Sequence, residues 1–352
     1  MSISDQTQRA QDNYFMMLAI EQAKRGLYTT RPNPAVGCLI VQSEKIVGQG
    51  FHPKAGEPHA EVFALKEANG QASGATAYVT LEPCSHTGRT PPCALALINA
   101  GVSRVVIAGL DPNPQVAGRG INLLKQAGIE VTIGVQTAQA EALNKGFLKA
   151  MRSQLPYVRL KMATSLDGRT AMMTGESKWI TGIAAREDVQ QLRALSSAII
   201  TGSETIVADD PQLNVRSTQL GVSAEQVASS RVVILDRRQR LAHDIESSYQ
   251  LCRHADTLYW RNSDLQALLK TLVSEYQCYD ILIEAGAAVS GSFLQQGLVD
   301  ELIVYQAPCL LGNATKPMVD FNPISLAQQL RFEYHHHERI GNDMKLTLLP
   351  CY

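Results

Sequence analysis

Apolar positions in the first part of the chain alternate between two spacings, and this alternation predicts an α/β domain. Residues 12–25 carry apolar side chains at helical spacing, and Gly26 follows as a helix stop. The short apolar runs at 36–42 and 45–51 predict two strands that form a hairpin. Similar patterns predict helices at 59–70, 91–101, 118–127 and 137–151 and strands at 75–82, 104–109 and 129–134. Strands that alternate with helices in this way form a sheet covered on both faces.

The same rhythm begins again after residues 153–156, where we place a domain boundary. A polar stretch at 217–230 predicts a surface loop, and residues 331–350 predict two closing antiparallel strands. Strands are expected at 157–165, 197–203, 231–236, 280–286 and 301–308, and helices at 183–195, 263–274 and 287–296. The chain is therefore expected to form two α/β domains, residues 1–152 and 153–352.

Composition and charge exclude several classes of protein. The 352 residues carry a net charge of -1, which gives no electrostatic reason to expect a nucleic-acid or membrane partner. No apolar run approaches the roughly 18 residues that a membrane helix needs, and the N-terminus lacks the pattern of a secretion signal. Seven cysteines, an odd number, favour reduced thiols, some of them metal ligands. We predict a cytoplasmic protein.

Four residues in the first domain carry the strongest chemical signal. His59 and Glu61 begin a predicted helix, Cys84 follows a predicted strand, and Cys93 lies at the start of the next helix. Zinc favours tetrahedral nitrogen and sulfur ligands, and a catalytic zinc keeps one position for a water whose pKa it lowers. We therefore predict one Zn²⁺ per chain on His59, Cys84 and Cys93. Glu61 is then placed to pass a proton from that water to a leaving amine.

The spacing of the two cysteines departs from the general deaminase pattern. That pattern is H-x-E followed by P-C-x-x-C, whereas eight residues separate Cys84 from Cys93. Other interpretations stay open at this point: four unrelated residues, or a structural zinc with His86 as a fourth ligand. A nucleic-acid-editing deaminase is disfavoured by the near-neutral charge and the 6% aromatic content. A zinc-stapled binding protein would unfold on chelation and show no turnover.

Motifs in both halves resemble those of the bifunctional riboflavin-biosynthesis deaminase/reductase family. In the first half these are RPNPAVGCLIV (31–41), HAE (59–61) and EPCSHTGRTPPC (82–93), and the long cysteine spacing is this family's form of the motif. In the second half they are LKMATSLDGRTA (160–171), GESKWITG (175–182), LRA (192–194), DDPQLNVR (209–216), LIEAG (282–286) and LVDELIVYQAPCLLG (298–312). The resemblance covers nearly the whole chain in family order.

This resemblance implies a fold and two reactions. The first domain would be a cytidine-deaminase-like α/β/α sandwich that removes the 2-amino group of 2,5-diamino-6-(5-phosphoribosylamino)pyrimidin-4-one. The second would resemble dihydrofolate reductase and use NADPH to reduce the ribosyl chain of this phosphorylated pyrimidine to a ribityl chain. A homodimer is also implied. The alternative is a deaminase with a degenerate second domain.

The resemblance also implies roles for individual residues outside the zinc motif. Lys161 and Asp209 would be catalytic in the reductive site. Substrate contacts are implied for Asn33, Ser177, Arg193, Leu213, Arg216 and Glu284. Contacts to NADPH are implied for Ala163, Trp179, Thr205, Asp209, Gly286, Ala287, Ala288, Val289, Ser290, Gly291 and Ser292.

Without the resemblance, the second half supports less. It has no G-x-G-x-x-G after a strand, and the turn at 284–292 is as compatible with an ordinary turn as with a phosphate-binding helix start. Lys161, Arg193 and Arg216 are candidate anion binders, although a single arginine is usually a solvated surface residue. Ala285 replaces a glycine that is usual in the family, so a methyl group there could narrow the approach to the cofactor or require a negative φ.

Overall fold

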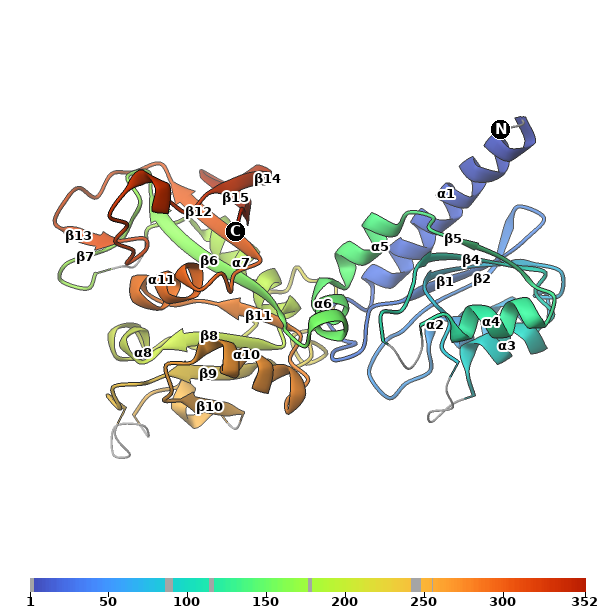
Figure 1. Ribbon diagram of the computed structural model, residues 1–352, viewed down its shortest axis with the longest axis horizontal. Helices are drawn as coiled ribbons and strands as arrows, with labels where there is room; N and C mark the ends of the chain where they lie inside the picture. The colour runs from blue at the N-terminus through green and yellow to red at the C-terminus, as the bar shows by residue number, and fades with distance from the viewer. Residues whose placement is uncertain (1–2, 86–90, 114–116, 177–178, 242–247, 255) are drawn as a thin grey trace. The chain divides into compact units, whose positions relative to one another are not determined.

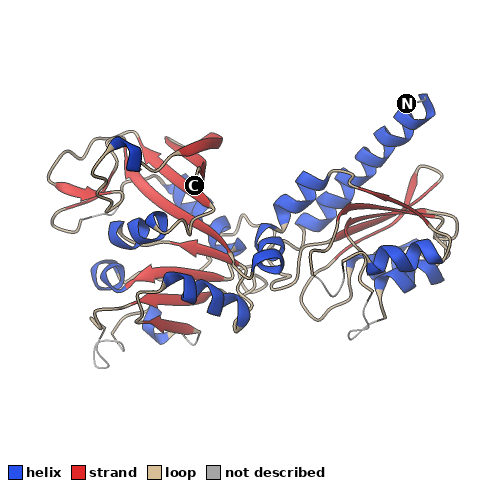
Figure 2. Ribbon diagram, viewed as in Figure 1, coloured by secondary structure: helices blue, strands red, loops and turns tan. Residues whose placement is uncertain are grey.

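The computed structural model of the protein describes residues 3–85, 91–113, 117–176, 179–241, 248–254 and 256–352. The chain forms two compact units, Met1–Ser153 and Gln154–Tyr352. Each unit is built around its own sheet with helices on both faces (Figures 1 and 2). The α/β class predicted for both halves is confirmed. None of the described helices is long and apolar enough to span a membrane.

The described part of the first unit contains a five-stranded sheet in the order β2-β1-β3-β4-β5. Its elements are α1 (Ile3–Lys24), β1 (Gly37–Gln42), β2 (Lys45–Phe51), α2 (Ala60–Ala68), β3 (Thr76–Leu81), α3 (Cys93–Asn99), β4 (Arg104–Gly109), α4 (Arg119–Gln126), β5 (Glu130–Ile133), α5 (Thr137–Leu143) and α6 (Lys145–Ser153). The predicted hairpin of β1 and β2 is confirmed, and β3, β4 and β5 run parallel. Helices α2, α3 and α4 pack on one face, and α1 and α5 on the other (Figure 1).

Helix α1 begins nine residues before the predicted start at Asp12, because its first turns are polar and exposed and carry no apolar pattern. Asp12 itself is buried, and it accepts two hydrogen bonds of 2.8 Å from the Arg104 guanidinium on β4 and one from the Tyr78 hydroxyl on β3. Burial raises the pKa of Asp12, but hydrogen bonding to Arg104 and the charge of Arg104 outweigh burial, so the pKa lies below its ordinary value. This contact fixes the helix on the sheet.

We expect Asp12→Asn to lower the stability of the first unit by about 2 kcal/mol, since hydrogen bonds to charged groups contribute about that much. The Asp12 pKa is depressed by folding, so its contribution is present above the unfolded value near 4 and is lost as pH falls through the folded value. Urea titrations read by hydrogen exchange of β4 amides, at neutral pH and at about pH 3, measure both effects. The matched control is Glu21→Gln on the same helix, whose exposed pair with Lys24 contributes little. Equal losses in the two variants would contradict the prediction.

The described part of the second unit contains an eight-stranded sheet in the order β10-β9-β8-β11-β6-β12-β15-β14 and a small β13-β7 ribbon. Its elements are β6 (Tyr157–Ser165), β7 (Arg169–Met172), α7 (Ile183–Leu195), β8 (Ala198–Gly202), α8 (Ser203–Asp209), β9 (Arg231–Leu235), η1 (Leu251–Arg253), β10 (Thr257–Trp260), α10 (Leu265–Ser274), β11 (Asp280–Ile283), α11 (Ala287–Gln295), β12 (Glu301–Ala307), β13 (Thr315–Pro317), η2 (Leu326–Gln328), β14 (Phe332–Ile340) and β15 (Asp343–Pro350). Helix α7 packs on one face, and α10 and α11 pack on the other (Figure 1). The predicted closing pair is the antiparallel hairpin of β14 and β15.

A buried charged cluster closes the amino end of the central strands. Arg159 on β6 donates to Asp280 on β11 at 2.8 Å and to Glu301 on β12 at 3.1 Å. Its neighbour Lys161 lies two residues further along the same face of the strand, as the alternation predicts. Arg159 is thus a structural residue near the amino end of β6, whereas Lys161, in the middle of the strand, pairs with Glu284 instead.

Candidate active sites

The first candidate site is a cluster of one imidazole and two thiols. His59 is the N-cap of α2, Cys93 is the first residue of α3, and Cys84 lies in the loop after β3. The Nδ1 atom of His59 is 3.6 Å from Cys84 Sγ and 3.3 Å from Cys93 Sγ, and the three candidate ligand atoms lie within 4.8 Å of one another. Nitrogen and sulfur ligands of one tetrahedral zinc are about 3.5 Å apart, as follows from ordinary Zn–N and Zn–S bond lengths. These residues therefore fit a zinc ion.

Two further observations support this fit. The Cys93 thiol and the His59 ring lower the pKa of the Cys84 thiol to about 4, which favours the thiolate that binds metal. Glu61, in the first turn of α2, is 3% exposed, and its Oε2 atom has no hydrogen-bond partner within the described part of the chain. A buried carboxylate oxygen without a partner is costly unless a ligand satisfies it. Burial raises the pKa of Glu61, and a cation bound nearby acts in the opposite direction.

His52 connects the cluster to Asn33. The His52 ring lies 5.3 Å from the His59 ring, centroid to centroid. Its Nδ1 atom is 3.1 Å from the Pro58 carbonyl oxygen, which can only accept, so Nδ1 carries the proton. Nε2 must then accept from Asn33 Nδ2 at 3.0 Å, and this fixes the orientation of the Asn33 amide. Burial lowers the pKa of His52, in agreement with a neutral ring. His52 belongs to no motif named from the sequence, so only the folded chain shows that it contacts Asn33.

Asn144 holds the loop that carries Asn33. Its Oδ1 atom accepts from the Ala35 N–H at 2.8 Å, and its Nδ2 atom donates to the Ala35 carbonyl at 2.9 Å. Asn144 is also where the helix predicted over 137–151 is interrupted, giving α5 and α6. The prediction of one continuous helix was therefore wrong. An asparagine at a helix end can use its amide for such a contact.

We expect Asn144→Ala to lower kcat/KM of deamination about tenfold, because the buried Ala35 N–H and carbonyl lose their partners and such losses cost about 1–3 kcal/mol. Zinc content and reductase activity should not change. Steady-state kinetics and metal analysis measure these quantities. Asn122→Ala, at an exposed position of α4, is the matched control. A wild-type rate in Asn144→Ala would mean that the Asn33 loop needs no support from this residue.

Glu82 links the loop that carries Cys84 to the start of α4. Its buried carboxylate accepts from the N–H groups of Gly118 at 3.0 Å and Gly120 at 3.1 Å, at the start of α4. A Cβ at Gly120 would lie 2.0 Å from the Pro83 carbonyl oxygen, so only glycine permits this approach. Negative charge at a helix start is favourable. His86, the alternative fourth ligand, lies outside the described residues.

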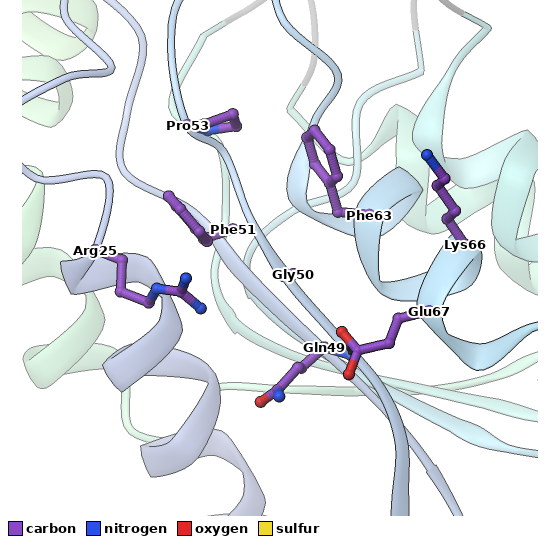
Figure 3. Close-up of a pocket in the computed structure, with 8 residues that line it drawn as sticks. All are labelled: Arg25, Gln49, Gly50, Phe51, Pro53, Phe63, Lys66 and Glu67. Atoms are coloured by element: carbon purple, nitrogen blue, oxygen red, sulfur yellow. Dashed lines mark hydrogen bonds between the residues drawn. The ribbon is translucent and has the colours of Figure 1, made fainter. Parts of the chain in front are cut away.

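A surface pocket of about 550 Å³ lies on the outer side of β2 (Figure 3). It is lined by Arg25, Gln49, Gly50, Phe51, Pro53, Phe63, Lys66 and Glu67. The Arg25 guanidinium lies 4.3 Å from the centre of the Phe51 ring. His52, between Phe51 and Pro53, instead lies against His59. No predicted site residue lines this pocket, so it is separate from the metal cluster.

The second candidate site is a buried carboxylate between two cations. Arg193, in the last turn of α7, donates to both oxygens of Glu284 at 2.6 and 3.1 Å. Lys161 Nζ lies 3.6 Å from Glu284 Oε2. Burial raises the pKa of Glu284, but the charges of Arg193 and Lys161 outweigh burial and lower it to about 2. Glu284 is therefore ionised at neutral pH and holds both cations at the carboxyl end of the parallel strands, where ligands bind in open α/β sheets.

The predicted cofactor residues of α8 and α11 lie close together. A Cβ at Gly286, the N-cap of α11, would lie 4.0 Å from Thr205 Oγ1 on α8. Thr205 and Asp209 are four residues apart on α8 and share a face. Gly291, which was also assigned to NADPH, has a different role. Gly291 is buried against the Asp320 carbonyl, 2.1 Å from where its Cβ would be, so it serves packing. These positions are compatible with a phosphate at the start of α11.

Four other residues singled out from the sequence of this unit lie outside the contacts described above. Trp179 is exposed, with the Arg186 guanidinium 4.1 Å from its ring centre, and Ala163 pairs in register with Tyr305. Ser177 lies outside the described residues. Ala285 has a negative φ, and its methyl group packs against the core under α10 and α11, so it introduces no backbone strain.

Comparisons with known proteins agree with this description of two sites. Residues 9–109 match the family described as the cytidine and deoxycytidylate deaminase zinc-binding region, and residues 156–346 match the RibD C-terminal domain. The chain is 47% identical to the riboflavin biosynthesis protein RibD of Haemophilus influenzae, covering 97% of this chain and 98% of the relative. Among solved structures, Acinetobacter baumannii RibD has a TM-score of 0.92 at 54% identity, covering 98% of this chain and 100% of that chain. A deaminase/reductase from Thermotoga maritima has a TM-score of 0.88 at 30% identity, with the same coverage.

The fold and the two sites therefore define a zinc-binding deaminase domain joined to a reductase domain. The match over 156–346 gives no support to a degenerate second domain. The chain belongs to the RibD family of riboflavin biosynthesis, and it is a bifunctional enzyme whose reductase domain uses NADPH.

Proposed function

We propose that residues 1–152 deaminate 2,5-diamino-6-(5-phosphoribosylamino)pyrimidin-4-one and that residues 153–352 then reduce the ribosyl chain of the product to a ribityl chain. The observation that carries this proposal is the convergence of His59, Cys84 and Cys93 beside a buried oxygen of Glu61 that has no partner in the part of the chain that the structure describes. A homodimer in the cytoplasm is part of the proposal and rests on the family resemblance alone.

In the deamination, His59, Cys84 and Cys93 would hold the metal and Glu61 would move the proton. When bound, zinc supplies a Lewis acid that lowers the pKa of a coordinated water. Glu61 Oε2, which has no hydrogen-bond partner among the described residues, would take up a proton from the attacking water, and the carboxyl would pass it to the departing amino group. Asn33, oriented by His52, hydrogen-bonds the edge of the pyrimidine. The buried position of these groups strengthens each contact.

In the reduction, the chain's residues bind and orient the substrate. When bound, NADPH supplies the hydride. Glu284, which follows the carboxyl end of β11, holds the ammonium of Lys161 from the middle of β6, and this ammonium would donate a proton to a substrate oxygen. Arg193, Leu213 and Arg216 contact the substrate, with Arg216 placed for its phosphate because a guanidinium binds phosphate in a bidentate manner. Thr205, Asp209 and the turn that begins at Gly286 contact NADPH.

Mass-resolved product analysis with the diaminopyrimidinone ribosyl phosphate, with and without NADPH, tests the proposal. Deaminated product without NADPH, and deaminated and reduced product with it, are expected. Deamination under both conditions without reduction would leave the zinc site standing and remove the reductase assignment. No product under either condition, with zinc bound, would indicate a structural metal.

A further inference from the structure

A segment without helix or strand carries two of the residues assigned to the reductase substrate. Residues 211–217 contain Leu213 and Arg216, and Leu213 has a positive φ of 47°. Within the described part of the chain, no backbone–backbone hydrogen bond involves these seven residues. Their conformation must therefore be maintained by side chains from elsewhere in the fold.

Helix α7 supplies those side chains from three positions spaced three residues apart. Glu187 accepts from the Ser217 hydroxyl, Gln190 Oε1 accepts from the Arg216 N–H at 2.8 Å, and Arg193 Nη1 donates to the Asn214 carbonyl at 3.2 Å. Positions three apart are neighbours on a helix surface, so the contacts run obliquely along one side of α7. Gln190 is buried, and its acceptor bonds the backbone of Arg216 itself.

The same helix is fixed to the sheet by other residues. Asp188 accepts from the Tyr305 hydroxyl on β12 at 2.5 Å and pairs with Lys345 on β15 at 2.7 Å. Arg193 is bound to Glu284 at the end of β11. Helix α7 is therefore bound both to the sheet and to the segment 211–217, so the segment has a fixed position relative to the sheet. The Arg216 side chain is exposed, with one contact from Nη1 to Gln212 at 2.6 Å, so its backbone is the part that is held firmly.

We propose that Gln190 is a positioning residue of the reductase, which acts by fixing the backbone of Arg216 so that its guanidinium faces the substrate phosphate. This proposal rests on the proposed role of Arg216 as a substrate contact. Removing the acceptor leaves the N–H of Arg216 without this partner and removes the one contact from α7 that holds the backbone of Arg216 itself. The effect is specific to the phosphorylated substrate, because none of the residues assigned to NADPH lies in 211–217.

The test compares Gln190→Leu with Gln191→Leu, the same change at the adjacent, exposed position of α7. With the deaminated pyrimidine ribosyl phosphate as substrate, we expect Gln190→Leu to raise the KM for this substrate up to about tenfold, the order expected for the loss of one hydrogen bond. The KM for NADPH, the kcat of reduction and the deaminase activity of the same chain should remain those of the wild type. Gln190→Glu, which keeps an acceptor oxygen, should restore the KM. Identical kinetics of Gln190→Leu and Gln191→Leu would overturn the proposal.

Arg216→Met separates this proposal from the one on which it rests. A raised KM in Arg216→Met with wild-type kinetics in Gln190→Leu would overturn the role of Gln190 alone. An unchanged KM in Arg216→Met would remove the assigned role of Arg216. If Gln190 acts through Arg216, the double variant has a KM close to that of Arg216→Met, whereas multiplied effects would show independent action.

Discussion

Deamination by a Glu61→Gln variant is expected to be slower by about 10²–10⁴-fold, the range in which a positioned acid–base group contributes. Glutamine keeps the shape of the side chain but cannot take up and release the proton. Zinc content should stay at one ion per chain, because Glu61 is not among the three candidate ligands. The reductase activity, which belongs to the other unit, provides an internal control for folding. The measurement is ammonia release by the zinc-loaded protein.

Two further variants make this result interpretable. Glu67 lies on the exposed side of the same helix, so a Glu67→Gln variant should deaminate at the wild-type rate. Cys84→Ser should lose both zinc and deamination, since the thiolate is the better ligand. Undiminished deamination by Glu61→Gln with zinc bound would require another proton carrier, and Glu61 would then be a structural carboxylate.

A Glu284→Gln variant is expected to lose most of its reductase activity and about 3–5 kcal/mol of stability in the second unit, the usual effect of removing one partner of a buried ion pair. Arg193 and Lys161 would then be two half-buried like charges that have lost the carboxylate between them. Both tryptophans, Trp179 and Trp260, lie in this unit, so urea unfolding followed by tryptophan fluorescence reports on it alone. Deamination should be unaffected.

The effect of pH on this variant has a defined sign. The Glu284 pKa is about 2 in the folded protein and 4.5 as its ordinary value, so the stabilisation is complete above about pH 4.5 and is lost as pH falls towards 2. The difference in unfolding free energy between wild type and Glu284→Gln should therefore be constant near neutral pH and shrink in acid. Glu275→Gln, an exposed change in the same unit, is the control. A stability difference that persists unchanged at pH 3 would show that Glu284 is not the ionised partner of the two cations.

The sequence predicted the long elements well because their apolar periodicity reflects the packing of one face on a core. Helix α7 and strands β6 and β12 lie within one residue of the prediction. Four short elements were missed, although β5 and β11, with four residues each, lie within the predicted strands 129–134 and 280–286. Strands β7, β10 and β13 have three or four residues, and α8 has seven, too few to show a period. The predicted strand over 197–203 ends at Gly202 because Ser203 begins α8.

The zinc ligands and Glu61 could be inferred because the motif itself specifies the chemistry. The supporting residues could not, since each acts on a partner far away in the chain. Asn144 bonds Ala35 across 109 residues, and Gln190 bonds Arg216 across 26. Neither residue type is unusual at its position, so only the folded chain identifies them. All seven cysteines are free thiols, in agreement with the prediction from their odd number.

The contact between Asn144 and Ala35 has a consequence for the order in which the enzyme matures during synthesis. Domains form from the N-terminus as the chain emerges from the ribosome. All three candidate zinc ligands and His52, which contacts Asn33, have emerged once residue 93 is free, but the two hydrogen bonds that hold Ala35 form only after Asn144 follows. The full set of metal ligands is therefore available before the support of the substrate-binding loop is complete. Synthesis supplies the two parts of one active site at different times.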